Sequence, residues 1–456
     1  MMAAPTFSTE PLELASRILA MAEAAGADQA DAVAVSSTNA STTVRLQKLE
    51  KVSESTARSV GLRVILGGRQ ATVSTSDVSD AALNEAVRTA MELAQISEHD
   101  PFAGLADPGT QARSEPQLAL FDEQIPELDG DHRLQQAMVC EQSALDADAR
   151  ISNSGGAAFS TSVSSFALVD TNGFSGTYAD TSASMWVEVM AQEEDGQMRN
   201  AGWSTSERSL HRLDDAAEVG REAAARALRQ LGAAKASTCE VPVVWEPRMA
   251  AGLAGIVSGA ASGEALYRRA TFLAEREQEE IASPLLTIVD DGTLSGRLGS
   301  RPFDGEGVVT RRNALIESGV FQGFLFDSYN ARRLEAASTG SAWRSVGGLP
   351  QIGSGNLSIE AGETAPERII GDVEDGLYLT TLMGFGVNYT TGDFSRGAAG
   401  IWIRNGELAE PVQEINVSGN LLEMLERIDA VGSDAQWFGS TSSPTLRMSR
   451  MTVSGA

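Results

Sequence analysis

Apolar and polar residues alternate along much of the first half of the chain, which is the pattern of half-buried strands. The alternation predicts strands at residues 31–37, 41–55 and 59–76 and a meander of strands across 160–204. Gly67-Gly68 and Asn172-Gly173 are typical hairpin turns, and a further turn is expected at residues 193–196. These segments therefore predict a sheet built from consecutive hairpins.

Helical spacing of apolar residues separates these strands. Helices are expected to begin at Ser8 or Thr9, at Ser79 or Asp80, near residue 130 and at Asp214. The last of them is followed by a linker of small residues, 233–237. We place a domain boundary there, so that the predicted domains are 1–232 and 238–456.

The second half opens with a strand, Cys239–Trp245, and a helix that begins at Pro247 and ends near Ser262. Short β segments dominate the remainder: 285–289, 307–310, 314–316, 320–325, 376–382, 401–404 and 407–412. The predicted fold class is α+β. We expect a sheet covered by helices in the N-terminal domain, and a larger, mostly antiparallel, barrel-like β domain that carries the Pro247 helix.

Composition narrows the classes of function. The chain has 456 residues, 42% of them hydrophobic, and a net charge of −27. A field of that sign repels phosphate backbones and anionic lipids, so nucleic acid and membrane are not expected as partners. No run approaches the ~18 apolar residues of a membrane span. Met1 to Glu10 lacks the pattern of a signal peptide and the two cysteines are scattered, so we expect a cytoplasmic protein.

Metal ligands do not cluster in the sequence. His99, His132 and His211 each lie in polar surroundings, and HExxH, HExxxH and CxxC motifs do not occur. Asp170-Thr-Asn-Gly173 resembles the start of a calcium loop, but Thr181 stands where such a loop needs a Glu. We interpret that segment as a hairpin turn.

Other reactive side chains have ordinary interpretations. Asp290, Asp291, Asp304 and Glu306 could pair as acid and base, although the glycines among them favour turns. Cys140 and Cys239 adjoin apolar residues, as buried thiols usually do. No GxSxG elbow occurs, so no nucleophilic triad is predicted.

The helix after Pro247 is unusual, because Gly252, Gly255 and Gly259 recur along one of its faces. Glycine costs roughly 1 kcal/mol relative to alanine inside a helix. Something should therefore press closely on that face. Two interpretations remain open: tight packing of the helix within this chain, or an interface or channel wall.

Four segments resemble one family over nearly the whole length of the chain. They are residues 267–273 (YRRATFL), 301–310 (RPFDGEGVVT), 382–400 (LMGFGVNYTTGDFSRGAAG) and 405–420 (NGELAEPVQEINVSGN). In these segments the chain resembles the TldD/PmbA (modulator of DNA gyrase) family. The resemblance implies a heterodimeric metalloprotease that degrades or trims unfolded peptides, including antitoxin and microcin-precursor substrates. The gyrase label then denotes an indirect effect.

The resemblance also implies which subunit this chain is. In the zinc-bearing subunit, an HExxxH motif lies on the helix after the strand that corresponds to Val241–Trp245, and a Cys near the C-terminus is the third ligand. The motif positions correspond to Gly255, Ile256 and Ala260 here, and residues 436–439 contain no Cys. The chain therefore resembles the PmbA (TldE) type of subunit, with no cofactor of its own. Zinc is expected in a TldD-type partner that carries HExxxH.

Peptide-binding or interface candidates can still be named. They are Gly252 and Gly259 on the helix, and Asn388, Thr391, Asp393 and Arg396 in a turn-rich segment. That segment suits the edge of a sheet, to which an extended peptide can add as a strand. A purely structural turn with a salt bridge explains it equally well. The rival functions are a non-proteolytic homodimeric scaffold and a self-sufficient hydrolase that uses Ser or carboxylates.

Overall fold

The computed structural model describes residues 9–113 and 116–455. Ser8 and most of the segment from Met1 to Glu10, on which the absence of a signal peptide was predicted, lie outside the described residues. In the part of the chain that is described, no helix has both the length and the apolar character needed to cross a membrane.

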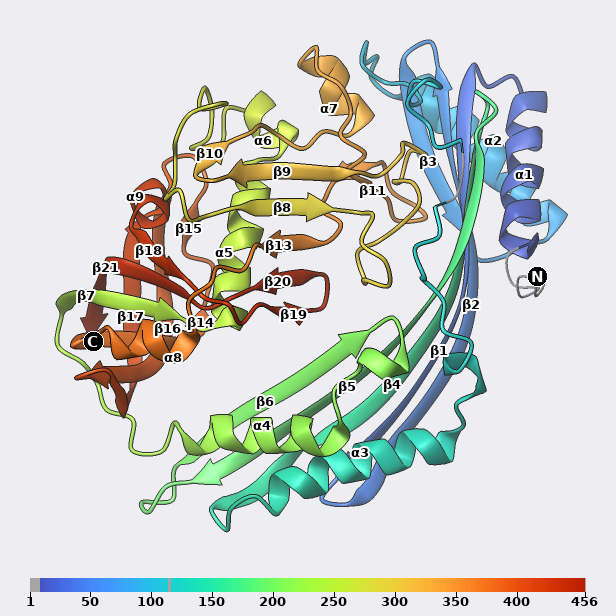
Figure 1. Cartoon of the computed structure of the whole chain (residues 1–456). Helices are drawn as coiled ribbons and strands as arrows, with labels where there is room; N and C mark the ends of the chain where they lie inside the picture. Colours follow the sequence, from blue (N-terminus) through green and yellow to red (C-terminus); the bar gives the residue numbers. More distant parts are fainter. Residues whose placement is uncertain (1–8, 114–115, 456) are drawn as a thin grey trace.

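One long, curved antiparallel sheet forms the N-terminal half (Figure 1). Its strands, in spatial order, are β3 (Arg69–Thr75), β2 (Lys48–Leu66), β1 (Gln29–Arg45), β4 (Ile151–Asp170), β5 (Ser175–Gln192) and β6 (Met198–Glu207). Val33 of β1 lies opposite Gly61 of β2 on one side and Leu168 of β4 on the other. The hairpins expected at Gly67-Gly68 and Asn172-Gly173 are present.

Helices cover one face of this sheet: α1 (Thr9–Ala24), α2 (Asp80–Ile96), α3 (Gly130–Leu145) and α4 (Ala216–Leu228). Side chains of a strand alternate between its two faces. Ala32 of β1 accordingly packs in the core beneath α1 and α2, and Val44 in the core beneath α3 and α4. Val33 points the other way, into a small cluster with Phe303 of the C-terminal half. The face without helices thus receives the rest of the molecule.

The C-terminal half contains a closed five-stranded barrel. Its strands, in order, are β14 (Asp375–Met383), β7 (Cys239–Trp245), β21 (Leu446–Gly455), β17 (Glu407–Asn420) and β16 (Asp393–Arg404), and β16 pairs with β14 to close it. Only the β14–β7 pair among them is parallel. β15 (Val387–Asn388) extends the sheet beyond β16, and β18 (Ile428–Val431) pairs with β21. The α+β fold and the barrel-like C-terminal half are therefore confirmed.

A second sheet stands beside the barrel. Its order is β10 (Val320–Phe321), β9 (Arg312–Glu317), β8 (Ile288–Asp291), β13 (Leu357–Ile359), β20 (Thr441–Ser443) and β19 (Gln436–Phe438). Helix α5 (Pro247–Ala260) contacts β7 and β14 of the barrel as well as β13 and β20 of this sheet. One core therefore joins Trp245, Leu253 and Ile316, which come from the barrel, the helix and the sheet.

Short elements complete the C-terminal half: α6 (Gly263–Tyr267), α7 (Ser328–Arg333), α8 (Pro366–Gly371), α9 (Leu421–Glu426) and the pair β11 (Ala342–Trp343) and β12 (Gln351–Ile352). The linker 233–237 is not free. The N–H of Ala234 donates to the carbonyl of Pro411 at 3.2 Å, and the N–H of Gln413 donates to the carbonyl of Ala234 at 3.1 Å. The division into domains 1–232 and 238–456 stays a prediction.

Several strand predictions were wrong in whole or in part. β8 covers only the last two residues of the predicted strand 285–289, and β10 only the first two of the predicted strand 320–325. Residues 55–59 do not interrupt a strand, because β2 continues through them; the turn lies instead at Leu46 and Gln47, with φ of 49° and 59°. No glycine or asparagine marks that turn, so its sequence gave no signal. Residues 307–310 form no strand either, since Val308 and Val309 make only isolated bridges, to Gln111 and Phe303.

Candidate functional site

Helix α5 has one buried and one open face. Pro247 occupies its first turn, where the missing N–H costs nothing. Leu253 and Val257 are fully buried in the core described above. Gly252, Gly255 and Gly259 are exposed. The apolar face of the helix thus packs in the core, and the opposite face exposes the backbone at the three glycines.

The two open interpretations of the glycines can be compared with the space around them. A Cβ atom added at Gly252 or Gly255 would meet nothing within 4 Å. A Cβ at Gly259 would lie 3.2 Å from the hydroxyl of Tyr389. Close packing within this chain therefore explains Gly259 only. That the face at the other two glycines forms an interface or a channel wall stays a prediction.

The positions that correspond to the zinc motif lie on this helix. Gly255 has no side chain, Ile256 is 8% exposed and apolar, and Ala260 is buried. α5 packs against β19 and β20, which brings it beside residues 436–439, where no thiol is present. The structure thus unites the two distant segments, but their side chains do not fit a zinc ion. Within residues 9–113 and 116–455, no three His, Cys, Asp or Glu side chains are grouped to hold a metal.

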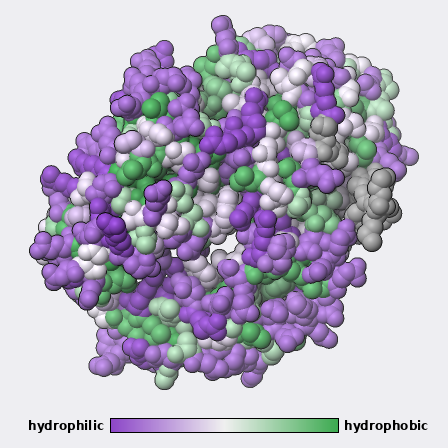
Figure 2. Space-filling view, viewed as in Figure 1, coloured by the Kyte–Doolittle hydropathy of each residue, from purple (hydrophilic) through white to green (hydrophobic). Residues whose placement is uncertain are grey.

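Cavities separate the central part of the curved sheet from the C-terminal half, where the space-filling view is hollowed (Figure 2). Three adjoining cavities of about 480, 580 and 500 Å³ lie there. Trp203 and Asp214 line both the first and the second, and Arg248 lines both the second and the third. We refer to the three together as the chamber.

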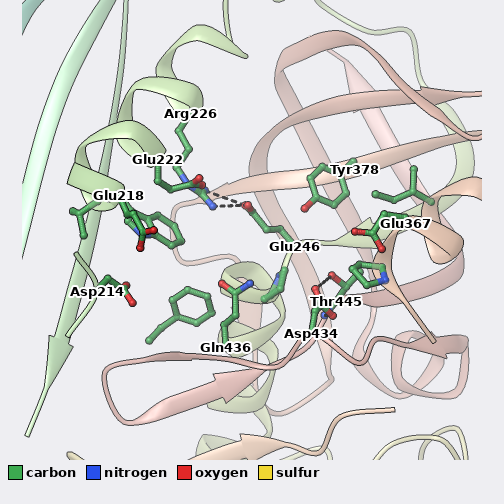
Figure 3. A pocket seen from close by; sticks show the side chains of 16 residues that line it. Asp214, Glu218, Glu222, Arg226, Glu246, Glu367, Tyr378, Asp434, Gln436 and Thr445 are labelled. Atoms are coloured by element: carbon green, nitrogen blue, oxygen red, sulfur yellow. Dashed lines mark hydrogen bonds and ion pairs between the residues drawn. The ribbon is translucent and has the colours of Figure 1, made fainter. Parts of the chain in front are cut away.

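The first cavity of the chamber is strongly acidic (Figure 3). Its carboxylates come from α4 and the segment before it, from the start of α5, from α8 and from the loop before β19: Asp214, Glu218, Glu222, Glu246, Glu367 and Asp434. Arg226 is the cation among its lining residues. This wall would attract positive charge and repel negative charge.

One ion-pair network crosses from α4 to the start of α5. Glu246 is 6% exposed and pairs with Arg226 at 2.5 Å and with Arg229 at 3.3 Å. The Arg226 guanidinium also stacks on Trp203, 3.9 Å from the ring centroid. Burial raises the pKa of the neighbouring Tyr378 phenol, so this side chain stays protonated at neutral pH. The network holds the two halves together at the chamber wall.

The candidate segment after β14 is a pinned turn at the edge of the barrel sheet. Asn388 Oδ1 accepts from the N–H of Thr390 at 3.0 Å, and Thr391 Oγ1 donates to Asp393 at 2.6 Å. β15 is the last strand at this end of the sheet and pairs with β16. The turn is confirmed. The predicted salt bridge is not, because Arg396 pairs with no described carboxylate and its Nε lacks a partner.

Apolar side chains surround this turn on the surface. Phe385 is fully exposed, Met383 is 50% exposed and Tyr389, the residue against Gly259, is 38% exposed. The N–H of Phe272 donates to the carbonyl of Tyr389 at 2.7 Å, which fixes the segment beside α5. The structure therefore brings the open helix face and the candidate turn together, although they lie about 130 residues apart in the chain.

Of the remaining acidic candidates, Asp170, Asp291 and Asp304 accept from N–H groups of their own turns, whereas Asp290 accepts from the N–H of Gly355 and Glu306 from that of Ser328, both far along the chain. Asp170 Oδ1 accepts from the N–H groups of Asn172 and Phe174, both at 2.9 Å. Asp304 Oδ1 accepts from the N–H groups of Glu306 and Val308, both at 2.9 Å. The turn interpretation is thus confirmed for both segments. Burial nevertheless raises the pKa of Asp304 to about 6.

Sequence reasoning missed the residues that line the chamber. Trp203, Arg226 and Arg248 carry no motif, and their role follows only from how α4, β6 and α5 meet. The local sequence signal closest to these residues was Pro247, which marks the start of α5.

Comparison with known proteins decides the family. Three models of the PmbA/TldA metallopeptidase match successive regions: domain 1 at residues 30–94, the central domain at 123–231 and the C-terminal domain at 238–455. The chain is 34% identical to metalloprotease PmbA of Escherichia coli O157:H7, covering 95% of this chain and 94% of that protein. The chain belongs to the PmbA/TldD metallopeptidase family.

A further relative supports the PmbA type within the PmbA/TldD family, and a solved structure supports the fold. A metalloprotease PmbA homologue of Haemophilus influenzae is 34% identical, with 91% of this chain and 90% of the relative covered. The crystal structure of a candidate modulator of DNA gyrase from Bacteroides thetaiotaomicron superposes with a TM-score of 0.92 at 28% identity. That match covers 99% of this chain and all of the other.

Proposed function

We propose that this PmbA-type chain is the metal-free subunit of a heterodimeric zinc peptidase, and that a TldD-type partner with an HExxxH motif binds the zinc. The observation that carries the proposal is the set of side chains on α5, where Gly255, Ile256 and Ala260 stand at the motif positions. None of them can bind a metal or accept a proton. Zinc, where the partner holds it, would activate the water that attacks a peptide bond.

In this proposal, the chain contributes the walls of the chamber and a sheet edge that binds the peptide, rather than the groups that react. The substrates are unfolded peptides of the antitoxin or microcin-precursor kind. An extended peptide could add to the barrel sheet beside β15, where main-chain hydrogen bonds bind without regard to sequence. The open face at Gly252 and Gly255 leaves room for a backbone to approach α5.

Two further points belong to the proposal. The chain acts in the cytoplasm, which agrees with the two unpaired cysteines, Cys140 and Cys239. On its own it can pair with a second copy, using the face that the TldD-type subunit otherwise covers.

The test is reconstitution. The chain is purified alone and together with the TldD-type protein of the same organism, and zinc content and cleavage of an unfolded peptide are measured. We expect the chain alone to be inactive and the complex to contain zinc and cleave. A complex whose TldD-type subunit carries Glu→Gln in the motif controls for contaminating proteases.

A variant of this chain tests its own contribution. An added Cβ at Gly255 meets nothing within 4 Å, so Gly255→Trp, which places a large side chain on the open face of α5, should retain folding while cleavage by the complex falls. Ala81→Trp, at an exposed site of α2, is the matched control and should leave cleavage unchanged. Metal-independent cleavage by the chain alone would instead indicate a self-sufficient hydrolase. Failure to form any complex would favour the homodimeric scaffold.

A further inference from the structure

A fourth cavity, of about 370 Å³, lies away from α5 between the curved sheet and the C-terminal half. Arg63 of β2 and Gln70 of β3 line it from the sheet, and Glu306, Asn330 and Arg333 line it from the other side. Its volume is within the range of roughly 300–1,000 Å³ that small-molecule sites occupy. The cavity is separate from the chamber and from the positions of the zinc motif.

Several hydrogen-bond acceptors of this cavity have no partner. Glu306 is 4% exposed, and while its Oε2 accepts from the N–H of Ser328 at 2.7 Å, its Oε1 accepts from no described group. Asn330 is 5% exposed, and its Oδ1 is unpaired although its Nδ2 donates to Asp327. The Oε1 of Gln70 is unpaired as well. Buried acceptors are nearly always satisfied, so we expect these oxygens to accept from a donor outside the chain, either a water molecule or a ligand group.

A cation without an anion lies in the same cavity. The Arg333 guanidinium stacks between two phenol rings, 3.3 Å from the centroid of Tyr267 and 4.9 Å from that of Tyr329. It makes no ion pair with any described carboxylate, and its Nε has no partner. The rings fix the guanidinium in place without neutralising it.

The other charged groups of the cavity are already engaged. Arg63 binds Asp31, and Arg268 pairs with Glu264 at 2.7 Å. Asp100 accepts from the hydroxyl of Tyr329 at 2.6 Å. Asp327 accepts from the N–H of Asn330 at 2.7 Å. What remains unpaired is a group of acceptors and one guanidinium.

We propose that this cavity binds a free α-amino acid or a dipeptide. The ammonium group of the ligand donates to the unpaired oxygens of Glu306, Asn330 and Gln70, because an ammonium has three donors and no acceptor. Its carboxylate pairs with Arg333, whose planar fork matches carboxylate geometry. A bare metal cation suits the cavity less well, since Arg63 and Arg333 line it too.

The proposal is tested on the full-length chain by ligand-observed NMR. The probes are the common amino acids and a set of glycyl dipeptides, which distinguish the two ligand sizes, and the strongest binder is then titrated by calorimetry. Its N-acetylated and carboxamide analogues are measured in parallel. We expect the zwitterion to bind and each capped analogue to bind at least tenfold more weakly. Binding by no probe would show that only water fills the cavity, and equal binding of the capped analogues would equally overturn the proposal.

Variants place the ligand in this cavity. Arg333→Met and Glu306→Gln should each weaken binding at least tenfold. Arg312→Met is the matched control, because Arg312 pairs with Glu360 on the surface and does not line the cavity. Thermal unfolding of each variant verifies that it is folded. Unchanged affinity in both cavity variants would place the ligand elsewhere and refute the proposal.

Discussion

At the scale of single residues, Glu306 gives this protein a pH dependence. Burial, with the Asp304 carboxylate adding to it, raises the pKa of Glu306 to about 7 from an ordinary 4.5. Between those values the folded chain binds the proton more tightly than the unfolded chain does, so this residue makes folding less stable as pH rises. The free energy of unfolding of Glu306→Gln, relative to that of the wild type, should therefore increase by roughly 1–3 kcal/mol as the pH is raised from about 5 to about 8.

Urea denaturation of both proteins at the two pH values measures this difference. Glu317→Gln, at an exposed position, is the matched control and should show no comparable change with pH. If the stability difference between Glu306→Gln and the wild type stayed constant over that range, Glu306 would have to titrate normally in the folded chain.

At the scale of elements, the glycines of two helices should respond oppositely to alanine. Gly252 and Gly255 of α5 face open space, so Gly→Ala at either position should stabilise the free chain by about 0.5–1 kcal/mol through helix propensity. At Gly220 of α4, an added Cβ would lie 2.2 Å from the carbonyl oxygen of Cys140 in α3. Gly220→Ala should therefore destabilise the chain. The thermal unfolding midpoints of the three variants, each compared with the wild type, test these expectations. A loss of stability in Gly255→Ala would mean that this face of α5 is covered.

At the scale of the whole molecule, buried charges join the two halves. Asp31 of β1 accepts from Arg63 of β2 at 2.8 Å and also pairs with Arg344 of the C-terminal half. Burial alone would raise the pKa of Asp31, but Arg344 and Arg63 outweigh it and lower that pKa. Asp31→Asn leaves two buried guanidinium groups without their anion, so we expect a loss of about 3–5 kcal/mol in chemical denaturation. Asp148→Asn, which removes the half-buried partner of the exposed Arg150, should change the midpoint little.

Local sequence patterns were sufficient to predict most helices and strands, but not all of the turns that connect them. Helices α2 and α3 and the strand before Pro247 follow from the spacing of apolar residues and from caps such as Ser79, which accepts from the N–H of Ala82. The turn at Leu46 and Gln47 could not be predicted, because both residues take left-handed conformations without a glycine. The buried carboxylate of Glu141 in α3 accepts from the N–H groups of both residues, at 2.8 and 2.7 Å, so the turn is held by a contact far along the chain.

The candidate site was predictable to a similar extent. The sequence by itself determined that Gly255, Ile256 and Ala260 carry no metal-binding group, since that depends only on which side chains are present. Only the tertiary structure decided that Gly252 and Gly255 face open space, that Tyr389 covers Gly259, and that Glu306 and Arg333 share a cavity. These facts depend on contacts between segments far apart in the chain, and such contacts arise from the packing of whole elements rather than from local spacing.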